Sequence, residues 1–76
     1  MRKDEFLTAL EDVLQMEDAL TENQDLTVLD EWDSLSKMAV MAYYKKNFNI
    51  EINLNDLKDI KTVEDLIKLA GENIND

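Results

Sequence analysis

The chain contains neither cysteine nor histidine, and this double absence limits how its 76 residues can fold. Without cysteine no disulfide can stabilise a small fold, and without either residue there is no zinc site of the usual kind. A chain of this length buries only roughly 60% of the surface that its unfolded form exposes. Apolar residues make up 45% of the sequence, which predicts a single folded domain over residues 1–76 held together by a hydrophobic core.

The same absences, together with the charge, exclude several functions. Because there is no imidazole base and no thiol nucleophile, we expect no catalytic residue, and we expect no metal site. The net charge of −10 argues against binding to nucleic acid or to anionic membranes, and it favours a monomer. The longest apolar stretch, residues 38–44, is too short to insert into a membrane, and no targeting signal is visible. The expected location is therefore the cytoplasm.

Apolar residues recur with helical spacing in several segments. The spacing predicts main helices over residues 4–16, 34–47 and 63–70, and a short helix over residues 55–59. The last helix has a capping box in Thr62 and Asp65 and a C-terminal stop at Gly71, the one glycine in the chain. Together these segments predict an all-α fold, a small bundle of three main helices plus one short helix.

Two connecting segments are harder to assign. Residues 17–33 have no steady period, and we interpret them as a long loop held to the core by single apolar residues, with room for a short helical turn: Leu20, Leu26, Leu29 and Trp32. Trp32 is more simply a loop anchor than a ligand contact, although it is close enough to the second helix to shield a bound group. From Phe48 to Leu54 apolar and polar residues alternate, and we expect an extended linker there because a single strand would have no partner.

The second predicted helix has two apolar stripes, and a small domain cannot easily bury both. One stripe contains Val40, Met41, Tyr44 and Phe48, and we assign it to the core. The other contains Leu35, Met38 and Ala42. This second stripe is either additional core or a surface for a partner or ligand, and its spacing alone does not decide between these alternatives.

Ser34 is the residue best placed for chemistry. Its hydroxyl lies between the long loop and the start of a helix, where free backbone N–H groups favour a phosphate esterified to the side chain. We also expect Ser34 to act as the N-cap of this helix. No base accompanies it in the sequence, so modification by another enzyme is a better interpretation than catalysis.

The segment from Leu29 to Ser36, Leu-Asp-Glu-Trp-Asp-Ser-Leu-Ser, resembles the modification site of acyl carrier proteins and of related peptidyl and D-alanyl carriers. In that family an Asp-Ser-Leu motif opens the second helix, and its serine receives 4′-phosphopantetheine from coenzyme A. The resemblance implies that Ser34 is the attachment residue, that Asp33 helps the modifying enzyme to place its substrate and magnesium, and that Leu35 completes the motif. It extends over about residues 4–70, because residues 48–52 and 59–63 are similar to the family's segments around the third helix.

The resemblance also implies a function. The chain would be a freestanding acyl or aminoacyl carrier protein that holds its cargo as a thioester on the phosphopantetheine arm and catalyses nothing itself. Its partners would be a phosphopantetheinyl transferase, a cargo-loading ligase or acyltransferase, and a downstream synthase or transferase. We expect the residues that dock these partners to lie on the second helix: Leu35, Lys37, Met38 and Ala42.

The charge of the second helix departs from the family pattern. Residues 37–48 contain three lysines and no acid, whereas the family's second helix is usually acidic. This departure suggests a carrier dedicated to one pathway with its own matched partners. The alternative is an acidic helical interaction module that has the carrier fold but no prosthetic group, and that binds a protein through Leu35, Met38 and Ala42.

Overall fold

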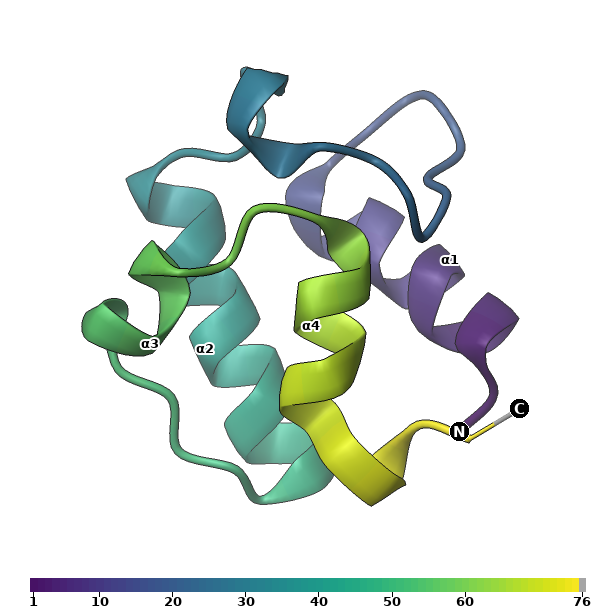
Figure 1. Cartoon of the computed structure of the whole chain (residues 1–76), viewed down its shortest axis with the longest axis vertical. Coiled ribbons are helices and arrows are strands. Elements are labelled where there is room, and N and C mark those ends of the chain that lie inside the picture. The colour runs from purple at the N-terminus through teal and green to yellow at the C-terminus, as the bar shows by residue number, and fades with distance from the viewer. Residues whose placement is uncertain (76) are drawn as a thin grey trace.

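The computed structural model of the chain describes residues 1–75, and within them it consists of helices and connecting segments without a strand (Figure 1). The elements, in chain order, are α1 (Lys3–Leu14), the 3-10 turn η1 (Leu26–Val28), α2 (Ser34–Phe48), α3 (Leu54–Lys58), α4 (Val63–Ala70) and the 3-10 turn η2 (Gly71–Asn73). The predicted all-α fold with three main helices and one short helix is therefore confirmed. The turn expected within the long loop is η1, and η2 was not predicted.

Two helices end differently from the prediction, for the same reason. α1 ends at Leu14 rather than residue 16, because Gln15 adopts the left-handed conformation with φ 56° and the N–H of Met16 donates to the Glu11 carbonyl at 2.9 Å. α2 continues to Phe48, one residue further than predicted, and stops where Asn49 has φ 57°. Helices often end with a left-handed residue that is usually glycine. In α1 and α2 glutamine and asparagine take that position.

The core is formed mainly by one face of each helix. In α1 the buried residues Phe6, Leu10 and Leu14 are four residues apart, the spacing that aligns side chains on one face. Val40 and Tyr44 of α2 are fully buried, and Met41 and Phe48 pack against them half-buried, which confirms this stripe as core. The remaining buried residues come from the loops, α3, α4 and the C-terminal segment: Leu20, Leu26, Ile52, Leu57, Ile60, Val63, Leu66, Ile67, Ala70 and Ile74.

The long loop between α1 and α2 is fixed at several points. Leu20 and Leu26 are buried, and Leu29 and Trp32 pack half-buried against the core, so the predicted apolar anchors are confirmed. The loop is also bonded to the segment that enters α4, because the Leu26 N–H donates to the Lys61 carbonyl at 2.7 Å. This backbone bond was not predicted. It helps to hold the long loop, and with it the segment that leads into α2, in a defined position.

The second half of the chain follows the predicted helix signals. Residues 49–53 form a linker, and α3 runs one residue ahead of the predicted 55–59 because Asn53 caps it through the Asp56 N–H at 2.9 Å. Thr62 and Asp65 form the predicted capping box of α4, and Gly71 ends the helix with φ 61°. After η2 the Asn75 N–H donates to the Met1 carbonyl at 2.8 Å, so these two residues lie side by side.

Candidate functional site

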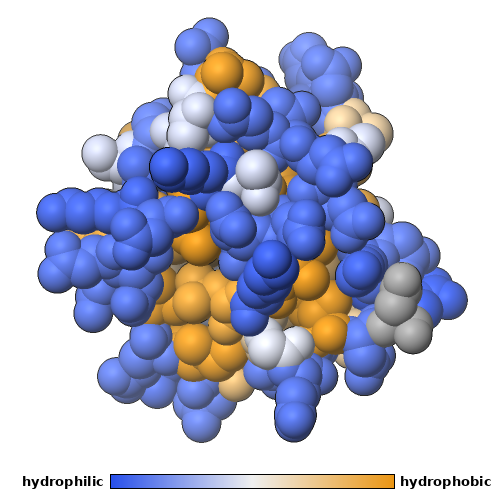
Figure 2. All heavy atoms as spheres, in the orientation of Figure 1, coloured by the Kyte–Doolittle hydropathy of each residue, from blue (hydrophilic) through white to orange (hydrophobic). Residues whose placement is uncertain are grey.

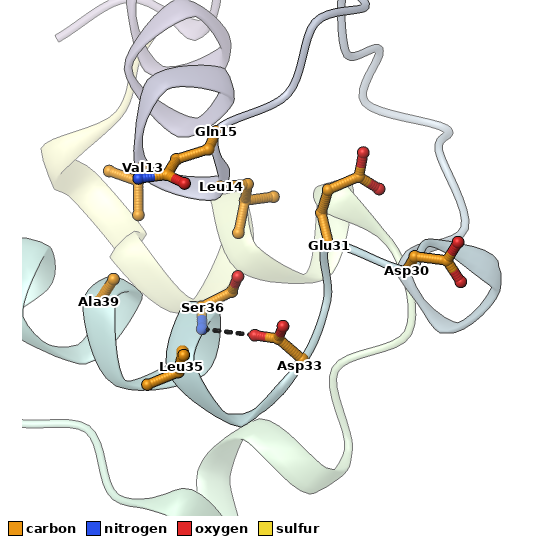
Figure 3. A pocket seen from close by; sticks show the side chains of 9 residues that line it. All are labelled: Val13, Leu14, Gln15, Asp30, Glu31, Asp33, Leu35, Ser36 and Ala39. Atoms are coloured by element: carbon orange, nitrogen blue, oxygen red, sulfur yellow. Dashed lines mark hydrogen bonds between the residues drawn. The ribbon is translucent and has the colours of Figure 1, made fainter.

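The site begins with the cap of α2. Asp33 is the N-cap residue, and its Oδ1 atom accepts a hydrogen bond of 2.9 Å from the backbone N–H of Ser36 (Figure 3). This hydrogen bond lowers the pKa of the Asp33 carboxyl, because it stabilises the charged form. The prediction that Ser34 caps the helix is wrong. Asp33 reaches the third N–H of the helix and takes the capping position, so Ser34 enters the helix as its first residue.

This arrangement leaves the Ser34 side chain uncommitted. The residue is exposed, and among the side-chain hydrogen bonds formed within residues 1–75 none uses its hydroxyl. A group esterified to this hydroxyl would not break the cap, because Asp33 provides the cap. The hydroxyl also lies at the positive end of a 15-residue helix, which favours an anionic group.

A groove that is lined by the neighbours of Ser34 in sequence lies between the C-terminal end of α1, the end of the long loop and the first turns of α2. Its volume is about 470 Å³, and Figure 3 shows the side chains that line it: Val13, Leu14, Gln15, Asp30, Glu31, Asp33, Leu35, Ser36 and Ala39. Apolar residues from α1 and α2 form part of this wall, and the carboxylates come from the loop. The contribution of Val13 and Gln15 was not predicted, because these residues lie 20 and 18 positions before Asp33 in the sequence.

The second apolar stripe of α2, which the sequence left open as either core or a binding surface, faces solvent. Leu35 is 78% exposed and Met38 is 59% exposed, and Ala42 is exposed as well. Next to this stripe a second groove of about 450 Å³ runs between α2 and the linker, lined by Met38, Met41, Ala42, Lys45, Glu51 and Ile52. Figure 2 shows apolar side chains gathered on the surface over the C-terminal half of α2 and beside α4, surrounded by polar ones.

Lys37 does not share this exposed stripe. It follows Leu35 by two residues, a spacing that places two helical side chains on different faces. Its ammonium group lies over the Trp32 ring, 5.6 Å from the ring centre, and the residue is half-buried. The predicted docking residues are thus divided between the solvent-facing stripe of Leu35, Met38 and Ala42 and the Trp32 side of the helix. Their role in docking stays a prediction.

A model of a protein family described as "phosphopantetheine attachment site" matches residues 4–70. The chain belongs to this family. The match covers all four helices of the carrier fold, from the first turn of α1 to the end of α4. No curated protein sequence and no solved structure gives a significant match.

Family membership defines the cofactor of this carrier protein. Its domain is a site of covalent 4′-phosphopantetheine attachment, and such domains carry substrates for other enzymes rather than catalyse reactions. The carrier therefore interacts with a phosphopantetheinyl transferase and with enzymes of its pathway. The residues at the start of α2 fit the group, because the exposed serine there lies at a helix N-terminus, and its neighbours Asp33, Leu35 and Ser36 line an open groove. Within residues 1–75 no helix has the length and the apolar composition needed to cross a membrane.

Proposed function

We propose that Ser34 carries the phosphopantetheine arm, and that the arm holds an acyl or aminoacyl cargo as a thioester. The observation that carries this proposal is the exposed Ser34 hydroxyl at the first residue of α2, left without a hydrogen bond within residues 1–75 because Asp33 caps the helix. In the attachment step the Ser34 oxygen bonds to the phosphorus that bears the pantetheine, the pyrophosphate bond of coenzyme A breaks, and adenosine 3′,5′-bisphosphate leaves. The serine proton passes to a base of the transferase.

Ser36 is the matched control for Ser34. It is the other serine of the chain, it lies in the same turn of α2, and its backbone N–H is the one that Asp33 caps. Two residues along a helix place its side chain on a different face from that of Ser34, and it is half-buried rather than exposed.

The experiment is loading of the unmodified protein with coenzyme A, magnesium and a broad-specificity phosphopantetheinyl transferase, followed by intact-mass measurement. We expect the wild type and Ser36→Ala to gain the mass of one phosphopantetheinyl group and Ser34→Ala to gain none. Loading of Ser34→Ala would overturn the assignment of the residue. A wild type that never gains mass would instead favour the interaction module without a prosthetic group.

We propose further that this carrier serves one dedicated pathway. The supporting observation is the charge of α2, whose residues 37–48 include Lys37, Lys45 and Lys46 and no acid. Lys45 pairs with Glu51 at 3.1 Å, while no ion pair among the described residues involves Lys46. Association is favoured between surfaces of opposite charge, so partner enzymes would present acidic groups toward this helix. The exposed Leu35, Met38 and Ala42 would supply the apolar part of the contact.

The partner charge can be tested with the cargo-loading enzyme once it is identified. The rate at which this enzyme adds cargo to the phosphopantetheine-bearing carrier should fall when Lys46 is replaced by glutamate. The difference in rate between wild type and variant should shrink as the salt concentration rises. A turnover that is unchanged at low salt would count against acidic partner surfaces.

A further inference from the structure

Lys37 has surroundings that neither the fold nor docking explains. Its side chain starts one helical turn after Ser34, and residues three apart on a helix are neighbours. Long side chains in a helix lean toward its N-terminus. Lys37 follows this rule, because its Nζ atom lies 5.6 Å from the centre of the ring of Trp32, a residue that precedes the helix. The ammonium group is therefore held at the end of α2 where the Ser34 hydroxyl is exposed.

The charge of Lys37 is also not neutralised by the nearby acids. Asp30, Glu31 and Asp33 all belong to the segment leading into α2, yet no ion pair within residues 1–75 includes Lys37. The Asp33 carboxylate bonds to the Ser36 N–H instead. The contact that holds the ammonium group is thus the face of an aromatic ring, which is a weak interaction for a partly exposed lysine. An anion placed beside it would compete with the ring successfully.

We propose that Lys37 binds the phosphodiester of the phosphopantetheine arm, and that Trp32 holds the lysine in position before the arm is attached. This inference rests on attachment at Ser34. The phosphodiester carries one negative charge next to the Ser34 oxygen, and a hydrogen bond between an ammonium and a phosphate oxygen is charge-assisted and stronger than a neutral one. Lys37 is then a positioning residue. It fixes the root of the arm against the Trp32 side of α2 and leaves the exposed stripe of Leu35, Met38 and Ala42 open.

The test compares unloaded and loaded protein for the wild type, Lys37→Met and Lys46→Met. Methionine keeps an apolar chain to cover Trp32 while removing the charge. Lys46 is the matched control, because it is an exposed lysine of the same helix about 14 Å beyond Lys37 along the axis, at 1.5 Å per residue. Intact mass reports loading. The ³¹P chemical shift of the phosphodiester and the fluorescence of Trp32, the single tryptophan of the chain, report the contact.

We expect loading to change the Trp32 emission in the wild type and in Lys46→Met, since the ammonium group moves from the ring to the phosphate. The ³¹P resonance of Lys37→Met should be displaced from the position shared by the other two proteins. In the wild type this resonance should move toward the Lys37→Met position as salt is raised, because the ion pair is screened. A ³¹P resonance at one position in all three loaded proteins would overturn the inference.

A second measurement needs no variant and covers the case in which Lys37→Met is not loaded by the transferase. In the wild type, NMR of the lysine side-chain ammonium groups should show a shift of the Lys37 signal on loading and an unchanged Lys46 signal. Equal, negligible shifts for both lysines would contradict the proposal. Failure of the wild type to gain mass would overturn the attachment at Ser34 and this inference with it, whereas loading without a Lys37 response overturns the inference alone.

Discussion

The phenol of Tyr44 donates a hydrogen bond to the backbone carbonyl of Leu66, which joins the middle of α2 to α4 inside the core. Tyr44 is fully buried, and the rings of Phe6 and Phe48 lie edge-on to it with ring centres 6.1 and 5.2 Å away. Burial raises the pKa of Tyr44 far above its ordinary value, and the neighbouring Tyr43 adds to the effect. The helix that bears Ser34 is thus anchored by a polar contact as well as by apolar packing.

Replacing Tyr44 by phenylalanine should therefore weaken the fold at neutral pH and reduce its sensitivity to alkali. The lost hydrogen bond should lower the free energy of unfolding by about 1 kcal/mol and the thermal midpoint by roughly 4–8 °C. The raised pKa means that the folded state keeps the phenol protonated. Its stabilising contribution is present below the unfolded pKa of about 10 and is lost as the pH rises above it.

Urea unfolding of the wild type and Tyr44→Phe at pH 8 and at pH 10.5–11 measures both effects. The difference in stability between the two proteins should be smaller at the higher pH, because only the wild type loses the contribution of Tyr44. Tyr43, whose pKa is also raised by burial, is present in both proteins and serves as a common background. A difference that stays constant with pH would show that Tyr44 does not titrate differently in the two states.

Asp33 should have separable structural and functional roles. Asparagine is as good an N-cap as aspartate, so Asp33→Asn should keep the thermal midpoint of the wild type at pH 7, whereas Asp33→Ala should lower it. Because the resemblance to carrier proteins gives the Asp33 charge a role in placing magnesium, both variants should be loaded more slowly by the transferase. Thermal unfolding and the initial rate of loading measure the two roles. If Asp33→Asn is loaded at the wild-type rate, the Asp33 charge has no role in loading and the residue acts only as the N-cap.

The exposed stripe on α2 should affect partner enzymes but not the fold. Met38→Glu removes an apolar side chain that is 59% exposed, so the free energy of unfolding should change by no more than about 0.5 kcal/mol. The kcat/KM of loading by the transferase should fall roughly fivefold or more, the equivalent of about 1 kcal/mol of contact energy. Thr8→Glu adds the same charge at an exposed position of α1 and should leave loading unchanged. An equal effect of the two substitutions would indicate a general charge effect instead of docking.

Gly71 should be difficult to replace although there is space around it. A β-carbon added there would meet no atom within 4 Å, but the residue has φ 61° and ψ −130°, a conformation that side-chain-bearing residues rarely adopt. Gly71→Ala should therefore lower the free energy of unfolding by about 1–3 kcal/mol in chemical denaturation. Lys68→Ala, an exposed change in the last turn of the same helix, is the comparison and should change stability little. Stability equal to wild type in Gly71→Ala would mean that the C-terminal segment readjusts without strain.

Local sequence signals predicted the helices well and their ends less well. Residues 63–70 were placed correctly because a capping box and a glycine mark both ends of that helix. The end of α1 was misplaced because Gln15 does not resemble a helix terminator. The bonds between the long loop and α4 could not be predicted either, since Leu26 and Lys61 are far apart in the sequence and are paired by their backbones.

The motif predicted where the candidate site lies, but the geometry of that region depends on the fold. Asp33 and Ser34 are both good capping residues, and adjacent choices of this kind are not distinguished by propensity. Likewise, the spacing of Leu35, Met38 and Ala42 defined a stripe without saying whether it was buried. The contact between Lys37 and Trp32 joins a helix to the preceding loop, and no sequence periodicity crosses such a junction.

The pairing of the Met1 and Asn75 backbones has a practical consequence for handling this carrier. Figure 1 shows the N-terminus and the last described residues together at one corner of the molecule, with the first turn of α2 on the opposite side. A support, an affinity tag or a neighbouring module joined to either end would therefore contact the side of the molecule opposite Ser34. The Ser34 side would stay accessible to partner enzymes. An immobilised form should therefore accept and release cargo as readily as the protein in solution.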